Sequence, residues 1–119
     1  MPDSSVQLTQ MTLATSRTPE MVKFYDILFG TNLQAMEAYG TTLYHGTLAG
    51  IPLVICPNEV AGVEAEQSRH QLAFQVDDLP ALLQNVENAG GAIQTPVSDS
   101  STRAILKDPD GNTIEVIQS

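Results

Sequence analysis

The chain carries the same series of hydrophobic patterns twice. Each half opens with a strand-like alternation of apolar and polar residues, continues with apolar residues at helical spacing, and closes with three more strand-like runs. The opening strands lie about 61 residues apart, and the glycines that end the helical patterns, Gly30 and Gly90, lie 60 residues apart. The strand-like runs lie at about residues 6–14, 33–39, 41–48, 51–56, 69–76, 92–96, 102–107 and 113–118.

The repeat predicts an α+β fold built from two βαβββ modules. The modules should occupy about residues 6–57 and 69–118, with a polar, acidic linker at about 58–68. A generic ferredoxin-like domain would account for one helix–strand alternation but not for the matched order of both halves. With 119 residues the chain can bury one real core, whereas two full domains would be crowded. We therefore expect a single domain over residues 1–119.

Local signals mark the ends of both predicted helices. Thr18 suits the N-cap of the first helix and Pro19 suits its first turn. Gly30 suits its end, where a left-handed backbone conformation is least costly for glycine. In the second half, Asp78 can cap a helix that the glycine pair at Gly90 ends. These signals place one helix in each module, directly after its first strand.

Three segments resemble the vicinal oxygen chelate superfamily, which includes glyoxalase I, bleomycin-resistance proteins and extradiol dioxygenases. The first covers residues 10–30, with the pair Phe24-Tyr25 in its helix and a closing glycine. The second covers residues 72–78, and the third covers residues 108–116, with the turn Asp-Pro-Asp-Gly-Asn before the last strand. The resemblance spans nearly the whole chain. It implies a mixed sheet of paired modules cupped around a pocket, and a protein that forms a homodimer.

Strand alternation indicates which side chains should face such a cup. In each strand the apolar alternate residues should pack against the helices, so the residues between them face the cup. A β-bulge would be needed to turn His70 toward the cup in place of its neighbour. The alternation leaves open which faces Tyr44, His45 and Arg103 occupy. The expected pocket residues are Gln10, Thr12, Val54, Cys56, Gln71, Ala73, Thr113 and Glu115.

The resemblance also implies where a metal would be held, on the first and fourth strands of each module. Those positions carry Gln10, Val54, Gln71 and Glu115 in this chain. Amide oxygens are weak donors for divalent transition metals and valine donates nothing. If a divalent metal bound, Gln10, Gln71 and Glu115 would hold it. The donor set disfavours a tightly held metal, and we expect no cofactor.

The charge of the chain bears on its partners. Its net charge is -9, from 14 acidic and five basic residues, which repels nucleic acid. The acidity chiefly favours solubility, and secondarily a cationic ligand. Cys56 is the single cysteine, and the N-terminal residues lack the pattern of a signal peptide. No apolar stretch reaches membrane-spanning length. We therefore expect a cytoplasmic protein that binds neither membranes nor nucleic acid.

Three functions remain open from the sequence. The first is metal-free binding of a small molecule in the cup, similar to bleomycin-resistance proteins. An aromatic content of 5% and the lack of tryptophan count against a flat ligand, which usually needs stacking surfaces. The alternative is a metal-dependent lyase, isomerase or dioxygenase of the glyoxalase I type, with Glu115 as a general base or ligand anchor. A regulatory domain that uses the fold only to dimerise is a third hypothesis.

Overall fold

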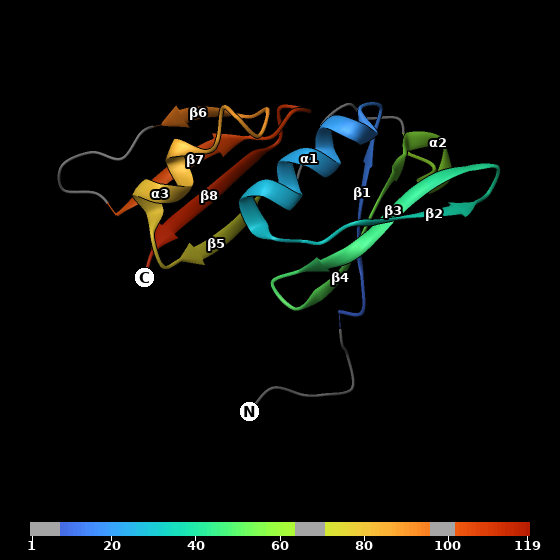
Figure 1. Ribbon diagram of the computed structural model, residues 1–119, viewed down its shortest axis with the longest axis horizontal. Helices are drawn as coiled ribbons and strands as arrows, with labels where there is room; N and C mark the ends of the chain where they lie inside the picture. The colour runs from blue at the N-terminus through green and yellow to red at the C-terminus, as the bar shows by residue number, and fades with distance from the viewer. Residues whose placement is uncertain (1–7, 64–70, 96–101) are drawn as a thin grey trace.

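The computed structural model of the chain contains two four-stranded sheets (Figure 1). The structure describes residues 8–63, 71–95 and 102–119. The strands in this part are β1 (Met11–Thr15), β2 (Gln34–Ala38), β3 (Thr41–Leu48), β4 (Ile51–Pro57), β5 (Leu72–Val76), β6 (Ala92–Thr95), β7 (Arg103–Lys107) and β8 (Thr113–Gln118). The helices are α1 (Thr18–Phe29), α2 (Asn58–Ala61) and α3 (Leu79–Gln84).

Each half of the chain builds one of the two sheets. The first has the order β1-β4-β3-β2 and the second the order β5-β8-β7-β6. In both sheets the first and last strands of the half pair in parallel, whereas the other pairs are antiparallel. Equivalent residues also pair, since Thr12 faces Val54 in one sheet and Ala73 faces Glu115 in the other. The predicted α+β fold of two repeated modules with mixed strand pairing is confirmed, and the modules form two separate sheets where one cupped sheet was predicted.

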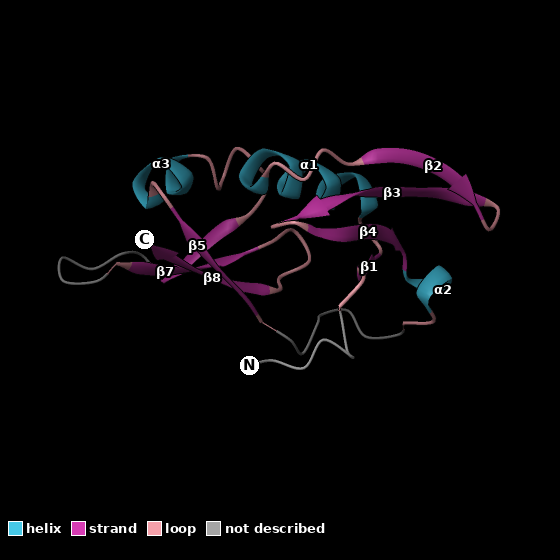
Figure 2. Cartoon of the chain, turned by 90° about the horizontal axis from the view of Figure 1, so that it is seen from below, coloured by secondary structure: helices cyan, strands magenta, loops and turns pink. Residues whose placement is uncertain are grey.

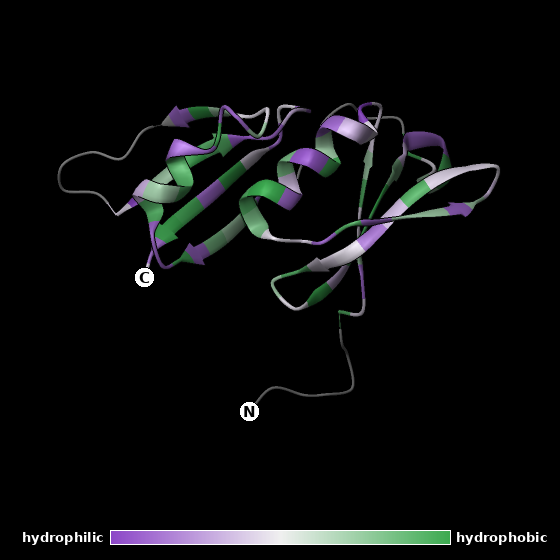
Figure 3. Ribbon diagram, in the orientation of Figure 1, coloured by the Kyte–Doolittle hydropathy of each residue, from purple (hydrophilic) through white to green (hydrophobic). Residues whose placement is uncertain are grey.

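The two sheets share one hydrophobic core with α1 and α3. Figure 2 shows α1 and α3 on one side of the sheets and α2 on the other. Fully buried side chains of α1, among them Phe24 and Tyr25, join the same cluster as Leu53 of β4 and Ile114 of β8. Figure 3 shows the matching alternation of hydrophilic and hydrophobic residues along β8. The apolar residues of the strands therefore pack against the helices, as the alternation predicted.

Some predicted boundaries need correction. The first strand begins at Met11, so Gln10 lies just before it, and residues 1–7 are outside the described part. Thr18 is the first residue of α1 and not its cap, because Arg17 occupies the cap position without a side-chain bond. The hydroxyl of Thr15 instead accepts a hydrogen bond from the backbone N–H of Arg17 at 2.8 Å. Gly30 ends α1 with φ 59°, as predicted.

The second helix and the linker also differ in extent from the prediction. Asp78 caps α3 as expected, accepting a hydrogen bond from the backbone N–H of Ala81 at 3.1 Å. Regular helix ends at Gln84, and hydrogen-bonded turns carry the chain from there to Gly90. The predicted linker begins with the short helix α2, which has only four residues and is too short to produce a helical periodicity in the sequence. His70 lies outside the described residues, and so do residues 64–68 of the linker.

A buried hydrogen bond joins α1 to the turn before β8. Tyr25 donates its hydroxyl proton to Oδ2 of Asp108 at 2.8 Å. The other carboxylate oxygen accepts the backbone N–H groups of Asp110 at 3.0 Å and Asn112 at 2.9 Å. Burial raises the pKa of Tyr25, and the charge of the Asp108 carboxylate raises it further, so the hydroxyl keeps its proton and remains a donor. The predicted tight turn is confirmed, since Gly111 has φ 86°.

No helix of the described chain is long and apolar enough to span a membrane.

Candidate functional site

The predicted pocket residues lie along the sheet face turned away from α1 and α3, which we call the open face. Within the first sheet, Thr12, Val54 and His45 stand side by side on β1, β4 and β3. Their neighbours Leu53 and Ile55 are fully buried in the core, so the alternation places this row on the open face. The register thus assigns His45 to the open face, which the sequence left undecided.

Tyr44 and Cys56 have environments of their own. Tyr44 pairs with Ile55 and packs against the core, on the opposite face from His45. Cys56 follows the same alternation as Val54, yet it is only 1% exposed and lies outside the core cluster. The helix α2 follows directly and packs on β1 and β4. Burial raises the pKa of the Cys56 thiol, with Glu59 a second cause. This thiol is not accessible to a ligand on the open face.

A polar row crosses the open face of the second sheet. Gln71 lies just before β5 and donates its side-chain amide to the hydroxyl of Thr113 at 2.9 Å. Thr113 pairs with Lys107 on the next strand, so the three side chains form one row. The next row consists of Ala73, Glu115 and Ile105. Four of the predicted site positions are therefore gathered on one face by strand pairing.

Glu115 is engaged by an arginine from β7. A guanidinium nitrogen of Arg103 lies 3.1 Å from a carboxylate oxygen of Glu115, whose side chain is 21% exposed. Strand alternation places Arg103 on the open face, because Ala104 next to it and Leu106 two residues further along β7 are buried in the core. A cationic ligand would have to compete with this arginine for the carboxylate. The same arginine contacts the carboxylate oxygen that a general base would use.

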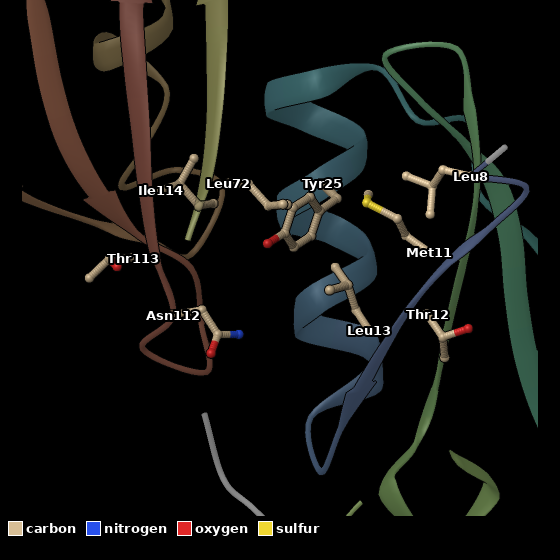
Figure 4. A pocket seen from close by; sticks show the side chains of 9 residues that line it. All are labelled: Leu8, Met11, Thr12, Leu13, Tyr25, Leu72, Asn112, Thr113 and Ile114. Atoms are coloured by element: carbon tan, nitrogen blue, oxygen red, sulfur yellow. The ribbon is translucent and has the colours of Figure 1, made fainter. Parts of the chain in front are cut away.

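An apolar pocket lies between the two sheets. It has a volume of about 380 Å³, and Figure 4 shows Tyr25 of α1 between the side chains of β1 and those of β5 and β8. Thr12 and Thr113 are the two predicted residues that line it. The other six predicted residues lie on the open face or under α2. The full lining is Leu8, Met11, Thr12, Leu13, Tyr25, Leu72, Asn112, Thr113 and Ile114.

Most of this lining was missed by the sequence analysis for a physical reason. Met11, Leu13, Leu72 and Ile114 belong to the apolar alternation that packs inward, and three of them are only partly covered by the core. They become accessible where β1 and β5, which are end strands of separate sheets, leave a gap. No local pattern signals such a gap, because it depends on how two sheets are placed around α1.

The residues at the expected metal positions do not fit a metal. The amide nitrogen of Gln10 donates to Thr12 at 3.0 Å, the amide of Gln71 donates to Thr113, and Glu115 is paired with Arg103. Within residues 8–63, 71–95 and 102–119, no three His, Cys, Asp or Glu side chains converge to hold an ion. Two neutral amides and one paired carboxylate give too little charge for a divalent metal. A metal-free site stays a prediction that metal analysis must test.

Comparison with known proteins adds a family and a fold. Residues 10–117 match the model of the glyoxalase-like domain. A glyoxalase-related enzyme from Fulvimarina pelagi superposes with a TM-score of 0.73 at 21% identity, covering 95% of this chain and 88% of that one. A glyoxalase/bleomycin resistance protein/dioxygenase family enzyme from Burkholderia phytofirmans PsJN also gives 0.73, at 17% identity and 95% and 98% coverage.

A third similar structure is described by what it binds. TnmS3, an antibiotic binding protein from Streptomyces sp. CB03234, superposes with a TM-score of 0.69 at 19% identity, covering 98% of each chain. No curated protein sequence matches this chain significantly. At such identities a structural likeness establishes the fold alone.

Proposed function

The chain belongs to the glyoxalase-like domain family, and from this premise we propose that it binds a small organic molecule in the pocket between its two sheets, without a tightly held metal. The observation that carries the proposal is the pocket itself. Its volume of about 380 Å³ lies in the range of small-molecule sites. Its walls are mainly aliphatic, and Thr12, Asn112 and Thr113 add a few polar groups. The likeness to an antibiotic binding protein supports this function.

The catalytic alternative has weaker support. It requires Glu115 to act on a bound substrate, but this residue does not line the pocket and is held by Arg103. In the described part of the chain, no cluster of three acidic, histidine or cysteine side chains accompanies it. Binding without chemistry needs only the pocket, so it is the function we favour.

A neutral fluorescent dye tests the proposal. N-phenyl-1-naphthylamine should bind wild-type protein with an increase in fluorescence, because the pocket is apolar. Thr12→Trp should weaken binding at least tenfold by filling the pocket from an exposed position, so that folding is preserved. Thr47→Trp is the matched control, since Thr47 is exposed on β3 and outside the pocket. Equal affinities for both variants and the wild type would contradict the proposed site, as would a lack of dye binding.

We also infer a homodimer that forms through the β2–β3 hairpin. Figure 2 shows this hairpin extending beyond α1. At its tip Tyr39 is 83% exposed, and Met36 on β2 is 41% exposed. Large exposed apolar side chains favour an interface. The Met36→Ser/Tyr39→Ser double variant should sediment as a monomer, whereas Ile27→Ser, at an exposed position on α1, should remain dimeric. A monomeric wild-type protein would overturn the inference.

A cytoplasmic location is proposed as well. Cys56 is the single cysteine of the chain and is buried without a disulfide. An unpaired thiol suits a reducing compartment. Fractionation of cells that express the full chain should recover it in the cytoplasmic fraction, and recovery from the medium or the periplasm would contradict the proposal.

A further inference from the structure

The net charge of the described strand positions on the open face differs in sign from the net charge of the chain. The chain as a whole carries a net charge of -9. Among the open-face strand positions of the described residues, the charged side chains are Arg103, Lys107 and Glu115. Arg103 and Glu115 neutralise each other in the ion pair. Among the described strand positions of this face, Lys107 therefore carries the one charge that no ion pair balances, and it is positive on a strongly acidic protein.

Lys107 stands beside the pocket. It pairs across β7 and β8 with Thr113, which lines the pocket. Directly opposed residues in a sheet have Cβ atoms about 5 Å apart, which a lysine side chain spans easily. Lys107 is exposed, whereas Leu106 and Asp108 on either side are buried, so its side chain lies on the open face. It forms no ion pair with a carboxylate of the described residues.

The other polar groups of this row are suited to an anion. The hydroxyl oxygen of Thr113 accepts the amide N–H of Gln71 at 2.9 Å. Its own proton is therefore available to donate, and it lies at the polar rim of the pocket. An ammonium and a hydroxyl donor next to an apolar cavity match a molecule with an apolar body and an anionic group. A cationic ligand, favoured by the net charge of the sequence, would face the wrong local charge.

We propose that the ligand is an amphiphilic organic anion, whose apolar body occupies the pocket between the sheets and whose anionic group binds Lys107 and the hydroxyl of Thr113. This inference rests on the proposed function, since it assigns the class of molecule that the same pocket takes. Arg103 and Glu115 belong to the neighbouring row. Their ion pair leaves that row without a net charge to compete with Lys107 for the anionic group.

Two dyes that differ by one sulfonate test the assignment. The anionic dye is 8-anilinonaphthalene-1-sulfonate, and N-phenyl-1-naphthylamine is the same body without the charge. The wild-type protein should bind the anionic dye more tightly. Lys107→Gln should weaken binding of the anionic dye about threefold to fivefold, as expected of a partly exposed charge pair, and should leave the affinity for the neutral dye unchanged. Lys23→Gln, the same change at an exposed position of α1, should alter neither affinity.

Two further measurements separate the possible outcomes. Glu115→Gln should tighten binding of the anionic dye. If the site took cations instead, the same variant would weaken binding of a cationic dye. Raising the sodium chloride concentration should weaken binding of the anionic dye only. If the neutral dye binds and responds to Thr12→Trp, but Lys107→Gln affects both dyes alike or neither, the anionic assignment is wrong while the proposed function stands. If neither dye binds, both proposals fail.

Discussion

Tyr25→Phe would remove one buried hydrogen bond between α1 and the turn before β8. The side chain is 1% exposed, and its hydroxyl donates to Oδ2 of Asp108, which is 3% exposed, at 2.8 Å. The ring would keep its packing against Phe24 and Phe29, whose centroids lie 5.0 and 5.9 Å away. Oδ2 would retain the side-chain amide of Asn112 at 3.0 Å. A hydrogen bond to a charged acceptor contributes about 1.5–3 kcal/mol, so we expect a loss of about 2 kcal/mol.

Guanidinium unfolding followed by circular dichroism measures this loss. A destabilisation of about 2 kcal/mol corresponds to a fall in Tm on the order of 10 °C for a chain of this size. The control is Tyr39→Phe, the same chemical change at a side chain that is 83% exposed, which should alter stability by less than about 0.5 kcal/mol. A double-mutant cycle with Asp108→Asn isolates the coupling between the two side chains. If Tyr25→Phe behaved like Tyr39→Phe, the argument that this bond stabilises the α1 contact would be refuted.

Three other predictions follow from buried or crowded groups. A Cβ at Gly91 would clash with the ring of Phe24 and a backbone carbonyl, so Gly91→Ala should destabilise by about 1–3 kcal/mol in the same unfolding assay. Burial raises the pKa of Asp110. A carboxyl group with a raised pKa in the folded state lowers the free energy of unfolding as the pH rises through that pKa. Asp110→Asn should therefore stabilise the protein at pH 7, and this stabilisation should vanish below about pH 4. Cys56 is buried with a raised pKa, so a thiol reagent at pH 8 should react far more slowly with native than with urea-unfolded protein, and equal rates would contradict its burial.

Local chemistry explains why much of the fold could be predicted from the sequence. Asp78 at a helix start, Gly30 at a helix end and the turn before β8 work through atoms within a few residues of one another. The predicted cap at Thr18 was wrong, because the helix already includes Thr18 and Arg17 occupies the cap position. The backbone N–H of Arg17 donates a hydrogen bond to the hydroxyl of Thr15. Such shifts of a few residues change element bounds but not the order of elements.

The candidate site was only partly accessible to the same reasoning. Alternation along β8 correctly separates Ile114 from Thr113 and Glu115, because it depends on one strand. It says nothing of the strand beside it, so the ion pair from Arg103 could not be foreseen. Cys56 has the alternation of a face residue, but the chain after it folds back as α2 and buries it.

The sequence by itself determined the repeated module, the faces of the strands and the weak donor set at Gln10, Gln71 and Glu115. These follow from periodicity and residue chemistry, which are properties of short stretches. Only the tertiary structure decided that the sheets remain separate around α1, that the pocket opens between them, and that Lys107 stands beside Thr113. Each of these depends on register and packing between residues far apart in the chain, where the free energy of the whole core, and not any local preference, selects the arrangement.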